Sequence, residues 1–158
     1  MSLFAYAREQ FQTAVKFFKS DLNALSDTQI TDSPAGKARP VCDFAYEVIC
    51  INDRVRSRMV GEDPGPWPFK DSWAICPAHL RSRDALIEEL EASSARVINT
   101  FEKIGEKRAM EEIDAPGAKT TPLQQMMFMS MHTMYHDGQI NYLQALQGDD
   151  KMNWPDEA

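Results

Sequence analysis

The sequence predicts an all-α fold, a four-helix bundle with one long crossover between its second and third helices. Three observations support this prediction. Apolar residues recur at steps of three and four along four separate segments, as on the buried face of a helix. No segment shows the strict alternation of a half-buried strand. Residues 61–79 separate the second helix from the third, and their four prolines and two glycines are unsuited to regular structure.

The first helix is predicted over residues 3–25, and residues 26–37 have the composition of a turn. The second helix is predicted over residues 39–60, with Pro40 acceptable in its first turn. Both segments carry a stripe of apolar residues expected to face the core. The stripes consist of Leu3, Phe4, Ala7, Phe11, Ala14, Val15, Phe18, Leu22 and Leu25, and of Val41, Phe44, Ala45, Val48, Ile51 and Val55.

The connection at 61–79 is long, and connections of this length often cover a site or cross a bundle. Its aromatic residues Trp67, Phe69 and Trp73 are expected to be buried, across one end of the bundle. The third helix is predicted over residues 81–105. Residues 106–119 are polar and contain a turn at Pro116–Gly117.

The fourth helix is predicted over residues 121–148 and has clear signals at both ends. Thr121 is expected to cap its start, with Pro122 at the first helical position and Gln124 closing a capping box. Gly148 marks the stop. The five methionines at 126–134 are interpreted as core and interface filler. Residues 1–158 are expected to form a single domain, with a loose tail from about residue 149.

Charge and composition restrict the partners. The 24 acidic residues outnumber the 17 basic ones, for a formal charge of −7, which disfavours nucleic acids and anionic membrane surfaces. No apolar run approaches the roughly 20 residues that a membrane span requires, and no signal peptide is recognised, so a cytoplasmic location is expected. Three cysteines form no zinc-binding spacing, and their odd number suits a reducing compartment. A small-molecule partner is expected.

The fourth helix carries the candidate functional residues His132 and His136. Their spacing brings both imidazoles to one face of the helix, roughly 6 Å apart along the axis, so that both can reach one metal ion. A hydrogen-bonded pair without metal remains an alternative. A zinc-protease helix is excluded because Thr133 stands where the catalytic glutamate is required. A di-iron carboxylate site is excluded because the chain has no Glu-x-x-His pair.

A third ligand is expected from the second helix. Glu47 lies three residues after Phe44 and four before Ile51, both on the apolar stripe, so it is predicted to project into the bundle. A carboxylate buried there needs a partner, which a metal ion would supply. Asp43, one turn earlier, is a rival ligand or a group that supports the ligands.

The residues HTMYHDGQ, which contain His132, His136, Gly138 and Gln139, resemble the signature of the last helix in the DinB-like superfamily of metal-binding four-helix bundles, also called YfiT-like metal-dependent hydrolases. The segment DFAYEV at 43–48 is similar to the family's run that supplies a histidine ligand, and Glu47 stands at that position. The resemblance covers essentially the whole chain. A set of two histidines and one glutamate resembles that of the thiol-dependent maleylpyruvate isomerases of this superfamily.

The resemblance implies a divalent metal (Zn²⁺, Ni²⁺, Mn²⁺ or Fe²⁺) held by Glu47, His132 and His136. It implies an enzyme that acts on a small organic molecule by hydrolysis or by thiol-dependent transfer or isomerisation, with a low-molecular-weight thiol as cofactor. It also implies a homodimer. Gln139 is expected to orient a ligand, and Tyr135 or Asp43 to handle a proton. No catalytic base is assigned. The alternative is a non-catalytic, dimeric bundle that binds a metal or another ligand.

Overall fold

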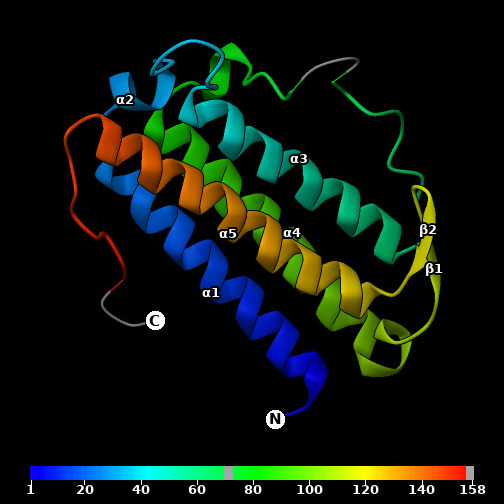
Figure 1. The fold of residues 1–158 in the computed structure, drawn as a ribbon. Coiled ribbons are helices and arrows are strands. Elements are labelled where there is room, and N and C mark those ends of the chain that lie inside the picture. Colours follow the sequence, from blue (N-terminus) through cyan, green and yellow to red (C-terminus); the bar gives the residue numbers. More distant parts are fainter. Residues whose placement is uncertain (70–72, 156–158) are drawn as a thin grey trace.

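The computed structural model describes residues 1–69 and 73–155, and these residues are predominantly helical, which confirms the all-α class. Long helices pack along one another: α1 lies against α5 and α4, and α3 lies against α4 and α5 (Figure 1). Two short helices and a small hairpin lie in the connections. The elements are α1 (Leu3–Ala24), α2 (Asp27–Thr31), α3 (Val41–Met59), η1 (Ala78–Leu80), α4 (Arg83–Ala109), β1 (Ile113–Ala115), β2 (Ala118–Thr120) and α5 (Pro122–Leu146).

The predicted apolar stripes meet in a core that extends along the helices. One cluster contains Phe18 and Leu22 of α1 together with Leu86 and Leu90 of α4, all fully buried. A second cluster lies further along the same helices and includes Phe11. Because burying one such side chain contributes about 1.5–3 kcal/mol, these clusters hold the helices in place.

The structure agrees with the predicted signals at the ends of the long helices. Thr121 Oγ1 accepts the backbone N–H of Gln124 at 3.1 Å, and Gln124 Oε1 accepts that of Thr121 at 3.0 Å. This capping box satisfies two otherwise unpaired donors and sets where α5 begins. Gly105 interrupts α4 with φ 73° and ψ 167°, at the residue where the sequence predicts the third helix to end.

Two connections contain more regular structure than the sequence predicts. Ser26 and Gln29 form a capping box that starts α2 within the segment interpreted as a turn. Strands β1 and β2 pair antiparallel around Pro116 and Gly117, and Gly117 has φ 76°, which favours glycine. Strands of three residues are too short to show alternation.

The expectation of buried aromatic residues at 61–79 is wrong for two of them. Trp67 is 44% exposed and Trp73 is 69% exposed, because the connection runs over the surface. Arg54 holds part of it by donating to the carbonyl groups of Pro64, Gly65 and Pro66. Residues 70–72 of this connection, and 156–158 of the predicted tail, lie outside the described residues.

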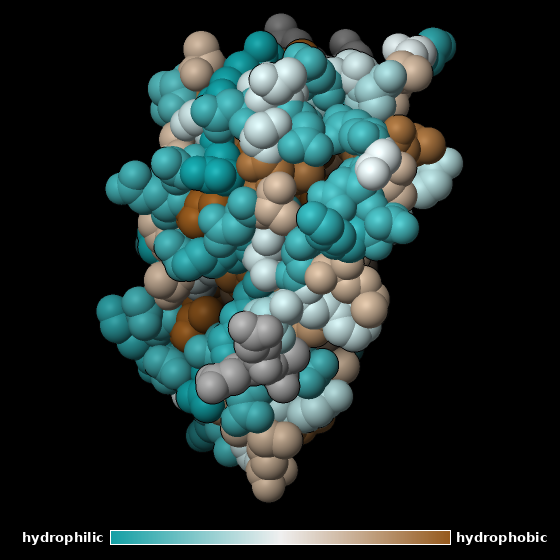
Figure 2. Space-filling view, turned by 90° about the vertical axis from the view of Figure 1, so that its left-hand side faces the viewer, coloured by the Kyte–Doolittle hydropathy of each residue, from teal (hydrophilic) through white to brown (hydrophobic). Residues whose placement is uncertain are grey.

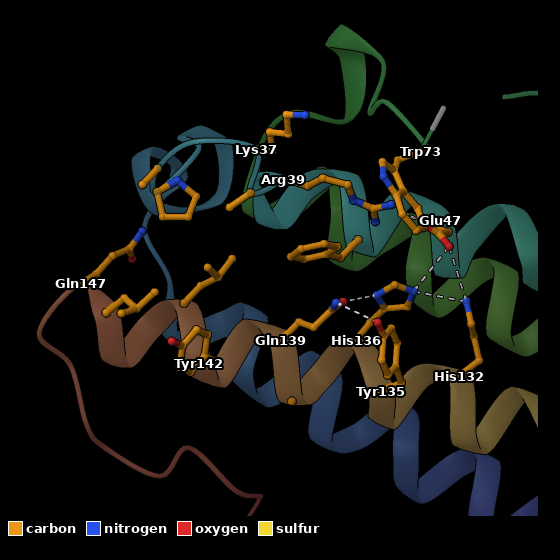
Figure 3. Close-up of a pocket in the computed structure, with 17 residues that line it drawn as sticks. Lys37, Arg39, Glu47, Trp73, His132, Tyr135, His136, Gln139, Tyr142 and Gln147 are labelled. Atoms are coloured by element: carbon orange, nitrogen blue, oxygen red, sulfur yellow. Dashed lines mark hydrogen bonds and ion pairs between the residues drawn. The ribbon is translucent and has the colours of Figure 1, made fainter. Parts of the chain in front are cut away.

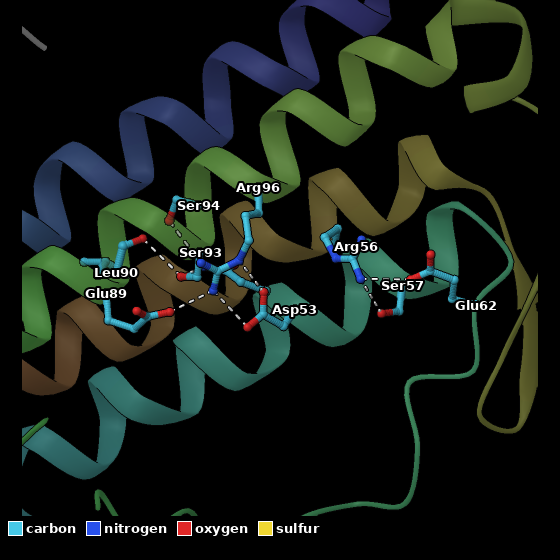
Figure 4. A network of polar contacts seen from close by, with 10 residues as sticks. Asp53, Arg56, Ser57, Glu62, Glu89, Leu90, Ser93, Ser94 and Arg96 are labelled. Atoms are coloured by element: carbon cyan, nitrogen blue, oxygen red, sulfur yellow. Dashed lines mark hydrogen bonds and ion pairs between the residues drawn. The ribbon is translucent and has the colours of Figure 1, made fainter. Parts of the chain in front are cut away.

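Polar groups join α3 to α4. Asn52, fully buried, donates from Nδ2 to the hydroxyl groups of Ser93 at 3.0 Å and Ser94 at 3.2 Å. Closer to the surface, Arg96 pairs with both Asp53 and Glu89 (Figure 4). This arrangement specifies which faces of the two helices meet.

Hydrophilic residues dominate the face in Figure 2, and hydrophobic residues show mainly in recesses between them. Among the described residues, no helix combines the length and the apolar character needed to cross a membrane.

Two carboxyl groups are buried together where α1 meets α5. Asp21 is fully buried and Asp137 is 3% exposed. Asn141 donates from Nδ2 to Asp21 Oδ2 at 2.5 Å. Burial, and then the charge of Asp21 and a hydrogen bond with it, raise the pKa of Asp137 to about 8. Asp137 is therefore protonated in the folded protein at neutral pH.

Asp137→Asn should weaken the pH dependence of stability in metal-free protein. Because the folded pKa of Asp137 lies above the ordinary 3.8, the folded state retains a proton that the unfolded chain loses. The wild-type free energy of unfolding should therefore fall as pH rises from about 4 to about 8. Near the lower pH, about 4, we expect the variant and the wild type to have the same free energy of unfolding. Near the upper pH, about 8, we expect the free energy of unfolding of the variant to be larger by on the order of 1–3 kcal/mol.

Urea unfolding across this pH range measures the effect, and Asp150→Asn, at an exposed position, is the control. Equal pH slopes in the wild type and Asp137→Asn would contradict the assignment.

Candidate metal centre

Three predicted ligand residues converge where α3 faces α5. Glu47 projects from α3, and His132 and His136 project from successive turns of α5 toward it (Figure 3). His136 is 3% exposed, and the side chains of His132 and Glu47 are 13% and 14% exposed. The packing of α3 against α5 produces this convergence. At this contact the ring of Phe44 stacks on the ring of His136, with 5.6 Å between the ring centroids.

The donor atoms are spaced as one small cation requires. His132 Nε2 and His136 Nε2 lie 3.2 Å apart, and Glu47 Oε1 lies 3.9 Å from the first and 3.7 Å from the second. A tetrahedral ion with bonds of about 2.0–2.1 Å separates its ligand atoms by about 3.3 Å. These three residues form a group that can hold a metal ion.

The tautomer of His136 favours metal binding. Gln139 Oε1 lies 2.7 Å from His136 Nδ1, and Gln139 Nε2 donates to the Tyr135 hydroxyl at 3.3 Å. Since the amide oxygen only accepts, His136 Nδ1 carries the proton, and the lone pair of Nε2 points toward His132 and Glu47. Gln139 thus lies where it can orient His136, and Tyr135 lies beside it; the orienting role stays a prediction.

Arg39, which precedes α3, is the partner of Glu47. Arg39 Nη1 donates to Glu47 Oε2 at 2.6 Å, which leaves Oε1 facing the two histidines. Burial alone would raise the pKa of Glu47. The contacts with His132 and His136, the hydrogen bond from Arg39 and the charge of Arg39 together outweigh burial and hold this pKa well below its usual range. Glu47 is therefore an anion, the form that binds metal.

A cavity of about 980 Å³ opens beside the three residues, between α5 and the segment before α3. Its wall contains Glu47, His132 and His136, and it reaches the surface at Tyr142 and Leu146, which are 67% and 61% exposed. This volume lies within the range for small-molecule sites, which is about 300–1,000 Å³. A small molecule in the cavity can reach the donor atoms.

Asp43 lies apart from this group. Its Oδ1 accepts the backbone N–H of Cys76 at 2.7 Å, so Asp43 ties the 61–79 connection to the start of α3. It is absent from both the ligand group and the cavity wall. His79 is exposed in η1 and is not part of the group either.

Arg39, Lys37 and Trp73 line the cavity and were not recognised as site residues from the sequence. Arg39 lies in an irregular segment where no apolar repeat indicates its direction. No signal in the sequence placed Arg39 beside Glu47, because Arg39 precedes α3 and helical spacing does not apply to it.

Comparisons with known proteins agree with the fold. The family model of the DinB superfamily matches residues 10–140. A conserved protein of Enterococcus faecalis has a similar structure, with a TM-score of 0.73, 18% identity, and coverage of 94% of this chain and 99% of that chain. A DinB-like protein of Bacillus cereus has a TM-score of 0.72, 12% identity, and coverage of 95% and 94%. At these identities the structural likeness concerns the fold alone. Comparison with curated proteins gives no significant match.

Gln139→Leu should shift the tautomer of His136 in metal-free protein. Without the amide oxygen, Nδ1–H loses its acceptor, so the Nε2–H form should gain population. Nitrogen-15 NMR of the imidazole rings measures this change. Gln147→Leu, at another residue of the cavity wall, should leave the signals of His136 unchanged. Unchanged His136 signals in Gln139→Leu would contradict the orienting role.

Proposed function

The chain belongs to the DinB superfamily, and from that premise we propose that it is a metal-dependent enzyme that acts on a small organic molecule. Glu47, His132 and His136 are the proposed ligands of one divalent ion. The observation that supports the proposal best is that their donor atoms lie in the wall of a cavity large enough for such a molecule. A sealed group would instead suit a structural metal.

The donor set accepts Zn²⁺, Ni²⁺, Mn²⁺ or Fe²⁺. When bound, such an ion acts as a Lewis acid and lowers the pKa of a water molecule or a low-molecular-weight thiol. The proposed reaction is hydrolysis or thiol-dependent transfer or isomerisation. The proposal takes residues 1–158 as one domain, with the long helices as a four-helix bundle and the 61–79 connection as its crossover.

The chain's own residues position the reacting groups. Arg39 holds one oxygen of Glu47 and thereby fixes the direction of the other. Gln139 orients His136. The Tyr135 hydroxyl accepts from Gln139, so its own O–H remains available to donate a proton to a molecule in the cavity.

A non-catalytic dimeric bundle is the second candidate. It is favoured by exposed apolar side chains along α5, where Met127, Met131 and Met134 are 42%, 66% and 43% exposed. The enzyme is preferred because the ligand group opens into the cavity.

Elemental analysis of protein purified without a histidine tag tests the proposal. His132→Ala and His136→Ala should each lower bound metal to near background, because each removes one of three ligands. Glu47→Gln should weaken metal affinity by more than about tenfold. Loss of a residue that only hydrogen-bonds to a ligand already costs about tenfold or more, and loss of a ligand should cost more.

Asp43→Asn is the matched control, because it is a carboxylate-to-amide change one turn away that keeps an acceptor for Cys76. It should leave the metal content unchanged. Full metal content in either histidine variant would reject the site. Weaker binding in Asp43→Asn than in Glu47→Gln would transfer the ligand role to Asp43.

A further inference from the structure

Arg39 has two donor atoms without a partner in the described part of the chain. Its Nη1 binds Glu47, but Nε and Nη2 are buried and make no hydrogen bond there. A buried donor without an acceptor is unfavourable, and more so on a charged group. Since Arg39 lines the cavity, a molecule bound in the cavity is a source for the missing acceptor.

These two atoms make up one edge of the guanidinium plane. Nε–H and Nη2–H point in parallel, and a carboxylate matches them with two oxygens. The rings of Phe44 and Trp73 lie against the guanidinium, with centroids 4.6 Å and 5.0 Å from its central carbon. The edge is therefore held in place before a ligand arrives, which lowers the entropic cost of binding.

The charge of the cavity wall also favours an anion. Among the described residues of the wall, Lys37 and Arg39 are the permanent cations, and Glu47 is the acid, already bonded to Arg39 (Figure 3). The chain as a whole has the opposite balance, with 24 acidic and 17 basic residues. The cavity is thus a locally cationic region on an acidic protein, which attracts anions.

The rest of the wall suits an apolar body. Phe44, Leu143 and Leu146 line the cavity beyond Arg39. We propose that the cavity binds a small organic carboxylate, with the carboxylate on the Nε–Nη2 edge of Arg39 and the apolar part along these three side chains. The inference that small organic carboxylates are the substrate class rests on the proposed function. The binding of a carboxylate by Arg39 does not require the metal.

Binding requires a local rearrangement, because both nitrogen atoms are covered. The ring of Trp73, which is 69% exposed, lies against the guanidinium, so a carboxylate that binds the Nε–Nη2 edge changes the surroundings of this ring. The fluorescence of Trp73 should therefore report the carboxylate.

Calorimetric titration with hexanoate, and with its neutral amide hexanamide, tests the proposal on metal-free and Zn²⁺-loaded protein. Hexanoate should bind at least about tenfold more tightly than hexanamide, because only the carboxylate matches the guanidinium edge. Arg39→Lys keeps a cation for Glu47 but removes the edge, and it should weaken hexanoate binding by at least about tenfold. Arg8→Lys, at an arginine of α1 whose Nη1 likewise binds a glutamate but which does not line the cavity, is the matched control and should bind like the wild type.

A second measurement avoids changes to Arg39. In a Trp67→Phe, Trp154→Phe background, hexanoate should change the fluorescence of Trp73 and hexanamide should not. Equal affinity for the two probes would overturn the proposal, and so would retained hexanoate binding in Arg39→Lys with loss in Lys37→Met. Metal binding without hexanoate binding would reject only the carboxylate site. Hexanoate binding without metal binding would reject only the metal-dependent function.

Discussion

The candidate site depends on one interaction, the sharing of the Glu47 carboxylate between a guanidinium and two imidazoles. Arg39 holds Oε2 at 2.6 Å, while Oε1 lies within 4 Å of both histidine Nε2 atoms. A carboxylate this buried would be unfavourable alone, and these neighbours keep it ionised. The same pairing gives the carboxylate a fixed direction, which a ligand atom needs.

The helical architecture positions this interaction at the edge of the core. Burial of Ala45 and Val48 fixes the rotation of α3 about its axis, and this rotation places Glu47 opposite α5. On α5, buried Met129 and Ile140 anchor the turns on either side of the two histidines. Because the cavity lies on the side where the segment before α3 diverges from α5, the group is held by packed helices and still opens to small molecules.

Regular features of this structure were predictable because they repeat. Steps of three and four located the long helices, and Thr121 with Gln124 located the start of α5. The same periodicity predicted that Glu47 projects into the bundle, and in the structure Glu47 lies beside His132 and His136. Arg39 was missed because it precedes the apolar stripe, which begins at Val41, and so no repeat indicated its direction. The partner of Asp43 was missed because Cys76 is 33 residues away along an irregular connection. The exposure of Trp73 was missed because hydrophobicity alone does not show that a connection runs over the surface.

The central claim is that Glu47, His132 and His136 bind one metal ion together. X-ray absorption spectroscopy of the protein loaded with one equivalent of Zn²⁺ tests it most directly. Two imidazole nitrogens and one carboxylate oxygen should surround the ion at about 2.0–2.1 Å, with any remaining position taken by another light atom. A sulfur neighbour at about 2.3 Å, which would indicate a cysteine ligand, or a first shell with fewer than two imidazoles would contradict the claim.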